Sequence, residues 1–252
     1  MGRGPLQIFV CGVLCAQPLL FAQDKAASPQ RASVSVPFIG CKSDGQVGPR
    51  EVPQGTSVAV PVDPKDAQGL AYYKSSIGPG VLAPRGWYCF GVYGSSGSNL
   101  LLSPEPIDTD HMFAPLHNGF TGSAIEVVYL PGDTSGLYEA ADIMARVFPD
   151  YRGIAIRAVE GLSLPVLTFG PFPDDVLTYK SKTAVEYKTP AQTNGLGTHS
   201  ALKKNGSPIE GVAMLIGEMP QAPDLLLLSV RLPPELAGLM PAIVRQFERD
   251  AR

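Results

Sequence analysis

Three serines in a short glycine-serine turn and the three histidines of the chain are side chains that a serine hydrolase would need. Such an enzyme holds a hydroxyl against a basic imidazole and stabilises the oxyanion with backbone N–H groups. The candidates are Ser95, Ser96 and Ser98 as nucleophiles, and His111, His117 and His199 as bases. The local text GSSGS lacks the final glycine of the Gly-x-Ser-x-Gly elbow, and such turns are common at hairpin tips. The pattern therefore favours a hairpin turn over a catalytic nucleophile.

A second set of side chains has the chemistry of a metal site. Asp108, Asp110, His111 and His117 supply the oxygen and nitrogen ligands that zinc and other divalent cations take. In an extended segment the two aspartates would share one side, and His117 could return across a turn at Pro115. No His-Glu-x-x-His motif or cysteine pair accompanies them, and acidic residues after prolines are typical of solvated turns. A divalent metal is therefore the alternative, and the prediction is that the protein has no cofactor.

Polar and aromatic residues beside the third and fourth cysteines of the chain form the last candidate site. They are Asp44 and Gln46 at the third cysteine, and Trp87 and Tyr88 at the fourth. A disulfide would bring both stretches together, and a tryptophan beside polar loop residues can stack on a sugar ring, a peptide or an aromatic ligand. The alternative, which the pattern favours, is that Trp87 packs on the disulfide and Asp44 caps its own turn.

The N-terminus has the pattern of a secretory signal peptide, which we place at 1–22. Arg3 is followed by an uncharged, mostly apolar stretch that ends in a small residue. We expect cleavage after Ala22 and a polar, flexible leader over 23–32. Pro18 weakens the alternative of a membrane-spanning helix, and no later stretch is long and apolar enough to be one. The expected location is extracytoplasmic, in the periplasm or the medium.

Cleavage at that point would leave two cysteines, because Cys11 and Cys15 belong to the signal peptide. Two cysteines in an exported chain predict one disulfide, Cys41–Cys89, since the compartment is oxidising. The bridge would close a loop of about 50 residues and stabilise the fold by on the order of 4 kcal/mol in the chain-entropy model. The alternative, a reactive thiol pair, lacks the Cys-x-x-Cys spacing that such pairs use.

Hydrophobic periodicity predicts the elements that must position these residues. The predicted strands are at 34–38, 58–62, 87–93, 100–102, 124–130, 176–188, 209–216 and 224–232. Pro61 marks the second strand as an edge, and the four consecutive leucines of the last one predict burial on both faces. Asn205 and Gly206 predict a hairpin turn into the strand that follows them. Apolar residues three and four positions apart predict two amphipathic helices, at about 137–148 and 235–250.

Short strands with two separated helices predict an α+β fold built mainly on antiparallel β-sheet. We expect a single domain over 33–252, with a subdomain seam near 131–133 if it divides. The 27 glycines and 25 prolines among 252 residues indicate many turns. A hydrophobic fraction of 44% and a net charge of only −3 exclude a disordered chain. The absence of clustered lysine and arginine argues against nucleic acid as a partner.

Three segments resemble a family of uncharacterised exported bacterial proteins. They are VPFIGCKSDGQVGP (36–49), VLAPRGWYCFGVYGSSGS (81–98) and PDLLLLSVRLPPELAGLMPAIVRQFE (223–248). The resemblance implies a bacterial, extracytoplasmic setting but no activity and no site residues. Together the patterns predict an exported, non-catalytic binding or assembly protein with a small-molecule, glycan or protein partner. The alternative is an exported hydrolase that uses a serine or a divalent metal between 95 and 117.

Overall fold

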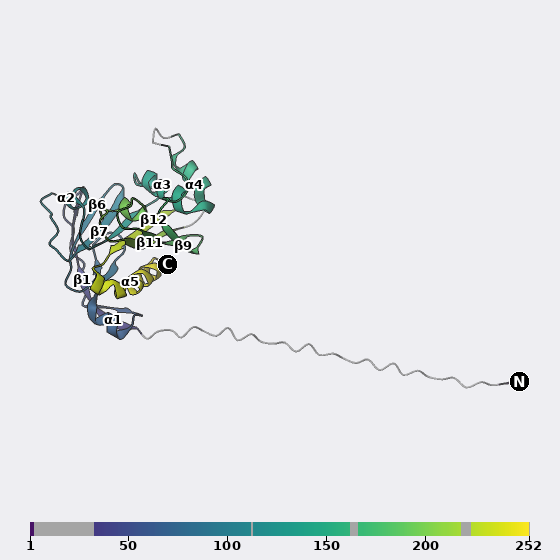
Figure 1. The fold of residues 1–252 in the computed structure, drawn as a ribbon, viewed down its shortest axis with the longest axis horizontal. Coiled ribbons are helices and arrows are strands. Elements are labelled where there is room, and N and C mark those ends of the chain that lie inside the picture. Colours follow the sequence, from purple (N-terminus) through teal and green to yellow (C-terminus); the bar gives the residue numbers. More distant parts are fainter. Residues whose placement is uncertain (3–32, 112, 162–165, 218–222, 252) are drawn as a thin grey trace. The chain divides into compact units, whose positions relative to one another are not determined.

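The computed structural model describes residues 1–2, 33–111, 113–161, 166–217 and 223–251. The predicted signal peptide (1–22) and leader (23–32) therefore lie outside the described residues, apart from Met1 and Gly2. The described residues from 33 to 251 belong to one compact unit. The fold of this unit follows from two sheets and the helices that cover them (Figure 1).

Eight strands form one large sheet, in the order β2-β6-β7-β8-β12-β11-β10-β9. They are β2 (Lys42–Gly45), β6 (Tyr88–Gly94), β7 (Gly97–Ser103), β8 (Ala124–Leu130), β9 (Val176–Ser181), β10 (Ala184–Thr189), β11 (Ile209–Ile216) and β12 (Asp224–Arg231). Neighbouring strands are antiparallel except for β2 and β6, which run parallel. The predicted α+β fold with mainly antiparallel strands is confirmed.

A smaller sheet of four strands has the order β3-β1-β4-β5. Its strands are β1 (Val34–Gly40), β3 (Ser57–Val60), β4 (Leu70–Lys74) and β5 (Val81–Pro84). Here β1 and β4 are parallel, whereas the outer pairs are antiparallel. The edge position predicted from Pro61 is confirmed, because β3 ends just before this proline and pairs only with β1.

The leucine run of β12 explains how the large sheet separates two hydrophobic cores. Successive side chains of a strand point to opposite faces. Leu226 and Leu228 pack into the core that contains α5 (Met240–Asp250) and the smaller sheet. Leu225 and Leu227 pack into the other core. The predicted burial of this strand on both faces is confirmed, and it follows from the position of β12 between β8 and β11.

Helices α3 and α4 cover the face of the large sheet opposite to α5 (Figure 1). The α-helices are α1 (Pro64–Gly69), α2 (Ala114–Asn118), α3 (Leu137–Val147), α4 (Arg152–Val159) and α5, and the 3₁₀ turns are η1 (Pro149–Tyr151), η2 (Leu196–His199) and η3 (Pro234–Leu239). The helix predicted at 137–148 is confirmed by α3. Its buried side chains include Ala141, Met144 and Val147, which the three- and four-residue spacing places on one face.

The helix predicted at 235–250 is correct only in its second half. The chain forms η3 over Pro234–Leu239, and α5 begins at Met240. The reason is Pro241, which has no N–H to donate and therefore interrupts the hydrogen bonds of a longer α-helix. At the first turn of a helix the missing donor costs little, so the proline fits where α5 starts.

The hairpin predicted at Asn205 and Gly206 is wrong. Leu202 forms an isolated parallel bridge with Phe120, while β11 pairs with β10 and β12. The Asn205 side chain donates to the Thr121 carbonyl oxygen at 2.5 Å. Asn205 and Thr121 are far apart in the sequence, so the local turn propensity of Asn205 and Gly206 cannot predict this hydrogen bond.

The predicted disulfide Cys41–Cys89 is present, with 5.5 Å between the two Cα atoms. Cys41 lies between β1 of the smaller sheet and β2 of the large sheet, so the bridge ties β6 to the point where the chain passes from one sheet to the other.

At the seam considered near 131–133, β8 ends with β7 on one edge and β12 on the other. Strands from both sides of that segment thus share one sheet. Within the described residues, no helix has the length and hydropathy of a membrane span.

Candidate functional site

The structure separates the four residues predicted to form a ligand site around the disulfide. Trp87 is 9% exposed and packs in a core with Cys41, and its backbone N–H donates to the Tyr73 hydroxyl at 3.1 Å. Tyr88, the next residue along the chain, is 52% exposed. The indole ring is therefore part of the core rather than a stacking surface for a ligand.

Asp44 and Gln46 lie toward the other end of β6. The parallel register pairs Asp44 with Val92, and its carboxylate accepts a hydrogen bond from the Gly45 backbone N–H at 2.7 Å. The Gln46 side chain accepts from the Ser95 backbone N–H at 2.9 Å. Both β2 and β6 run away from the disulfide in the same direction. Asp44 and Gln46 therefore lie beside the later part of β6, whereas Trp87 precedes this strand. Asp44 is held by its neighbour Gly45, and Gln46 is held by the β6–β7 turn.

The residues predicted to bind a metal are only partly brought together. The Asp108 carboxylate accepts from the Asp110 backbone N–H and from the Asn118 carboxamide, each at 3.0 Å. The rings of His111 and His117 have centroids 6.1 Å apart. In the part of the chain that the structure describes, no three histidine, cysteine or acidic side chains form a group that could hold a metal ion.

The candidate hydrolase serines lie in the β6–β7 turn. The Ser95 hydroxyl is 3.0 Å from the Ser135 hydroxyl and 3.4 Å from the Gln46 side-chain nitrogen. Ser98 is buried in β7. The polar contacts of Ser95 therefore link two turns, the arrangement expected of a hairpin tip.

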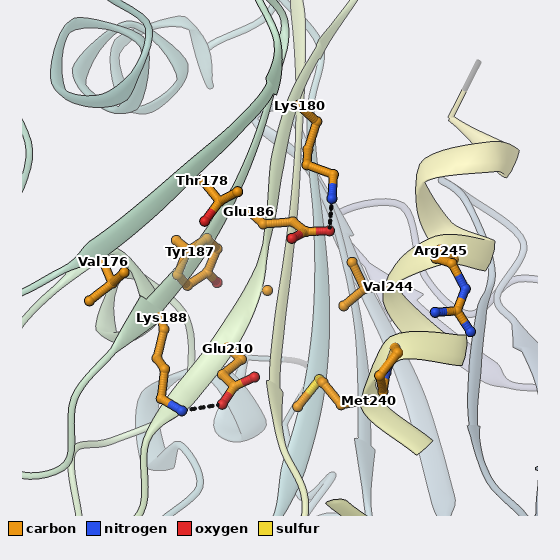
Figure 2. A pocket seen from close by; sticks show the side chains of 12 residues that line it. Val176, Thr178, Lys180, Glu186, Tyr187, Lys188, Glu210, Met240, Val244 and Arg245 are labelled. Carbon is orange, nitrogen blue, oxygen red and sulfur yellow. Dashed lines mark ion pairs between the residues drawn. The ribbon is translucent and has the colours of Figure 1, made fainter. Parts of the chain in front are cut away.

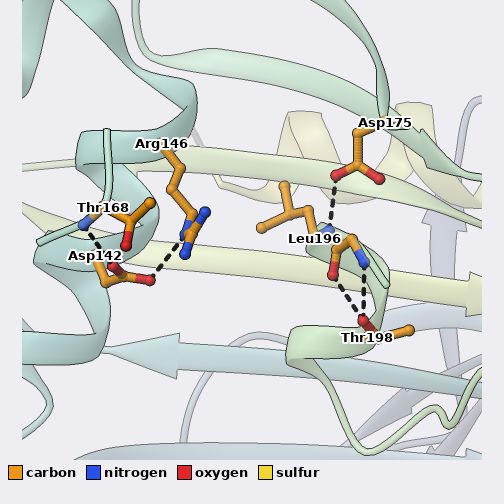
Figure 3. Close-up of polar contacts among 7 residues, drawn as sticks. Asp142, Arg146, Thr168, Asp175, Leu196 and Thr198 are labelled. Carbon is orange, nitrogen blue, oxygen red and sulfur yellow. Dashed lines mark hydrogen bonds and ion pairs between the residues drawn. The ribbon is translucent and has the colours of Figure 1, made fainter. Parts of the chain in front are cut away.

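His199 lies elsewhere, at the end of η2. Hydrogen bonds among Asp175, Leu196, Thr198 and Gly195 support this turn (Figure 3). The ring centroids of His199 and Phe172 are 5.1 Å apart. The Arg146 guanidinium carbon lies over the Phe172 ring, 4.2 Å from its centroid. Burial lowers the pKa of the His199 imidazole. The Asp175 carboxylate accepts from the Leu196 backbone N–H at 2.7 Å and so caps η2. This cluster has the character of a structural support.

A groove beside α5 offers a more complete set of binding groups (Figure 2). This α5 groove has a volume of about 400 Å³ and lies between the helix and the open face of β9, β10 and β11. Its lining residues are Val176, Thr178, Lys180, Glu186, Tyr187, Lys188, Glu210, Gly211, Met240, Pro241, Val244 and Arg245. A second cavity of about 700 Å³ shares Lys180 and reaches Ala251, just beyond the end of α5. The hollowed surface therefore extends along the helix.

Two cross-strand ion pairs lie on the sheet side of the groove (Figure 2). Lys188 and Glu210 are directly opposite in the β10–β11 register, with 2.7 Å between ammonium nitrogen and carboxylate oxygen. Lys180 contacts Glu186 at 3.0 Å, and this hydrogen bond raises the pKa of the lysine. Solvent-exposed pairs of this kind add little to folding stability. They do supply donors and acceptors to a ligand.

The helix side of the groove combines apolar surface with one unmatched charge. Met240 and Val244 line it with their side chains, and Arg245 is exposed beside them. Among the described residues the Arg245 guanidinium forms no ion pair. The groove thus contains three cationic and two anionic side chains, and Arg245 is the cationic one that forms no ion pair with another described residue. An acidic ligand group would compensate it.

Sequence reasoning missed this groove. The charged residues of β9, β10 and β11 read as the polar face of strands, and Arg245 as the solvated side of an amphipathic helix. What makes them a site is that α5 covers only part of the sheet face, which is a property of the tertiary packing.

Comparisons of the chain with protein-family models, with curated proteins and with solved structures found no match.

Proposed function

We propose that this chain is an exported bacterial binding protein that acts without catalysis and holds a peptide in the α5 groove. The observation that carries the proposal is Arg245, an exposed guanidinium beside the apolar Met240 and Val244, in a groove whose other charges are paired. A guanidinium binds carboxylates with two parallel hydrogen bonds, which gives both affinity and orientation. An acidic side chain next to an apolar one matches these groups.

The α5 groove and the cavity that shares Lys180 with it together follow α5 from Met240 to Ala251, and this length favours a peptide over a compact small molecule. Helix α5 has 11 residues and is therefore about 16 Å long. At about 3.3 Å per residue, an extended peptide of about five residues would span it. The edge strand β9 lines the same surface, and extended peptides commonly bind beside such edges.

The disulfide supports the proposed location outside the cytoplasm. Bridges such as Cys41–Cys89 form and persist in oxidising compartments and are rare in the cytosol. The N-terminal pattern of Arg3 followed by an apolar stretch is that of a segment that directs export.

The binding proposal is tested with capped peptides of about six residues in which leucine alternates with glutamate, glutamine or lysine. We expect the glutamate peptide to bind most tightly in isothermal titration calorimetry. Replacing the guanidinium in Arg245→Ala should weaken this peptide about tenfold, because a hydrogen bond to a charged group contributes roughly 1.5–3 kcal/mol.

Arg249→Ala is the matched control. Arg249 is exposed on the same helix and donates to Gln246 at 3.0 Å, but it does not line the groove. Its replacement should leave the affinity unchanged. Equal binding of the three peptides, or an affinity that survives Arg245→Ala, would show that the groove is not the binding site.

A further inference from the structure

Another cavity lies away from α5, between the segment that follows β7 and the segment around α2. Its volume is about 490 Å³, and it is lined by residues 103–108 and by residues from 115 to 123. The first segment contributes Glu105 and Asp108, and the second contributes Asn118 and Phe120. Serine and threonine hydroxyls also line it, so most of its polar side-chain groups are hydrogen-bond acceptors or hydroxyls.

One wall of this cavity is held in place by a buried arginine. Arg231 is 2% exposed, and its guanidinium donates to the carbonyl oxygens of Phe120 at 2.7 Å, Gly122 at 2.8 Å and Lys203 at 2.6 Å. The carbonyl between the first two, that of Thr121, accepts from the Asn205 side chain. Three consecutive carbonyls of the wall are therefore bonded to side chains.

This arrangement is energetically expensive. Arg231 forms no ion pair with any described residue, and a buried charge without a counter-ion loses hydration that hydrogen bonds restore only in part. The guanidinium bridges segments near 120 and 203 that are distant in sequence, and it fixes the shape of the wall. A wall that is rigid before binding saves the ordering cost that a ligand would otherwise incur.

A hydrogen bond from Asn118 of the second segment to Asp108 of the first joins the two segments and holds further acceptors at the cavity. The Asp108 carboxylate accepts from the Asn118 carboxamide and from the Asp110 backbone N–H, both at 3.0 Å. Each carboxylate oxygen has a further lone pair, and the Asn118 carbonyl oxygen is another acceptor. The buried Ser103 hydroxyl, which accepts from the Glu105 backbone N–H at 3.1 Å, lies in the same cavity.

The charges around the cavity select among ligand classes. Its described lining has two carboxylates, Glu105 and Asp108, and no cationic side chain, so it disfavours an anion. The Arg231 guanidinium behind the other wall disfavours a cation. A neutral molecule with several hydroxyl donors satisfies both conditions, and Phe120 and the prolines of the lining offer apolar surface to its C–H groups.

The geometry points to a binding site for a sugar, in which hydroxyl groups donate to Asp108 and Glu105 and the sugar ring lies against Phe120. The site is separate from the α5 groove and does not depend on the peptide-binding proposal. It contains Asp108 of the predicted metal site, whereas Asp110, His111 and His117 do not line it.

Saturation-transfer NMR with glucose, galactose, mannose and N-acetylglucosamine tests this site in the full chain. We expect at least one sugar to receive magnetisation, and Asp108→Ala to weaken its affinity at least about tenfold, because hydroxyls bonded to a carboxylate lose their partner. Asn118→Ala, which releases the Asp108 carboxylate, should weaken it in the same direction.

Asp110→Ala is the matched control, since Asp110 is exposed, follows closely in the chain and does not line the cavity. It should leave sugar binding unchanged, as should Arg245→Ala in the α5 groove. Absence of transfer to all four sugars, or an affinity that survives Asp108→Ala, would overturn the assignment. Calcium or magnesium binding that Asp108→Ala abolishes, without any sugar binding, would overturn it in favour of a cation site.

Discussion

At the scale of single residues, Glu126 shows how burial controls a titration. This side chain of β8 is 1% exposed and accepts hydrogen bonds from the Asn99 carboxamide at 2.8 Å and the Ala201 backbone N–H at 2.5 Å. Burial raises its pKa from 4.5 to about 7, although both hydrogen bonds act in the opposite direction. The carboxyl group therefore keeps its proton in the folded chain at pH values where the unfolded chain has lost it.

The sign of the resulting pH dependence is fixed by these two pKa values. Below pH 4.5 Glu126 is protonated in both states and contributes no pH dependence. As the pH rises from 4.5 to about 7, only the unfolded chain ionises, so the free energy of unfolding falls. The loss amounts to about 3 kcal/mol over this window, and it levels off at higher pH.

Glu126→Gln should remove this dependence. A glutamine cannot ionise, and its carbonyl oxygen can still accept from the Ala201 N–H. We expect urea unfolding at pH 5 and pH 8 to differ less in the variant than in the natural chain, by about 2.5 kcal/mol. Glu51→Gln, at an exposed position, should keep the natural difference. An unchanged difference in Glu126→Gln would mean that the carboxyl group ionises equally readily in both states.

At the scale of elements, the turns and helix starts depend on a few backbone positions. Gly97 begins β7 with a φ of 134°, and a Cβ atom there would lie 2.0 Å from the Tyr129 carbonyl oxygen of β8. Gly238 in η3 is exposed and has open space around it. The two glycines thus have different roles, because one permits the close approach of two strands and the other only adds freedom to the unfolded chain.

Alanine at these two positions should change stability in opposite directions. Gly238→Ala should raise the free energy of unfolding by about 0.5 kcal/mol, since it restricts the unfolded chain at no steric cost. Gly97→Ala should lower it by more than about 2 kcal/mol, because of both the positive φ and the carbonyl contact. Urea denaturation measures both changes. Destabilisation by Gly238→Ala, or a neutral Gly97→Ala, would contradict this assignment of roles.

At the scale of the whole molecule, one large sheet separates two cores and forms one side of the α5 groove. Helix α5 and the smaller sheet cover one part of a face, and the α5 groove lies where this cover ends. The disulfide links β6 to the crossing between the two sheets. It therefore restrains the relative position of the sheets as well as a loop in the unfolded chain.

Loss of the Cys41–Cys89 disulfide should lower the free energy of unfolding of the whole fold. We expect the double variant Cys41→Ala, Cys89→Ala to lose on the order of 4 kcal/mol in unfolding free energy, as the chain-entropy model predicts for a loop of this length. Reductant should destabilise the natural chain by a similar amount and leave the double variant unaffected. Equal stability of the natural chain with and without reductant would show that the bridge does not hold the fold.

The sequence by itself determined the fold class, helix α3, most strands and the disulfide. These depend on local periodicity and on cysteine number, both of which can be read along the chain: the leucine run of β12, for example, requires burial on both faces wherever the strand lies. The sequence also indicated the edge strand through Pro61. Even there the partner of the edge, β1, was not predictable.

Only the tertiary structure decided which polar residues meet. The parallel register of β2 and β6 took Asp44 away from Trp87, and burial made Trp87 part of the core. Arg231 reaches carbonyl groups about 110 residues away, at Phe120 and Gly122, and no local pattern encodes such a contact. Hydrophobic periodicity reports which face of an element is buried, whereas a binding site depends on where another element stops covering that face. That boundary exists only in the packed molecule.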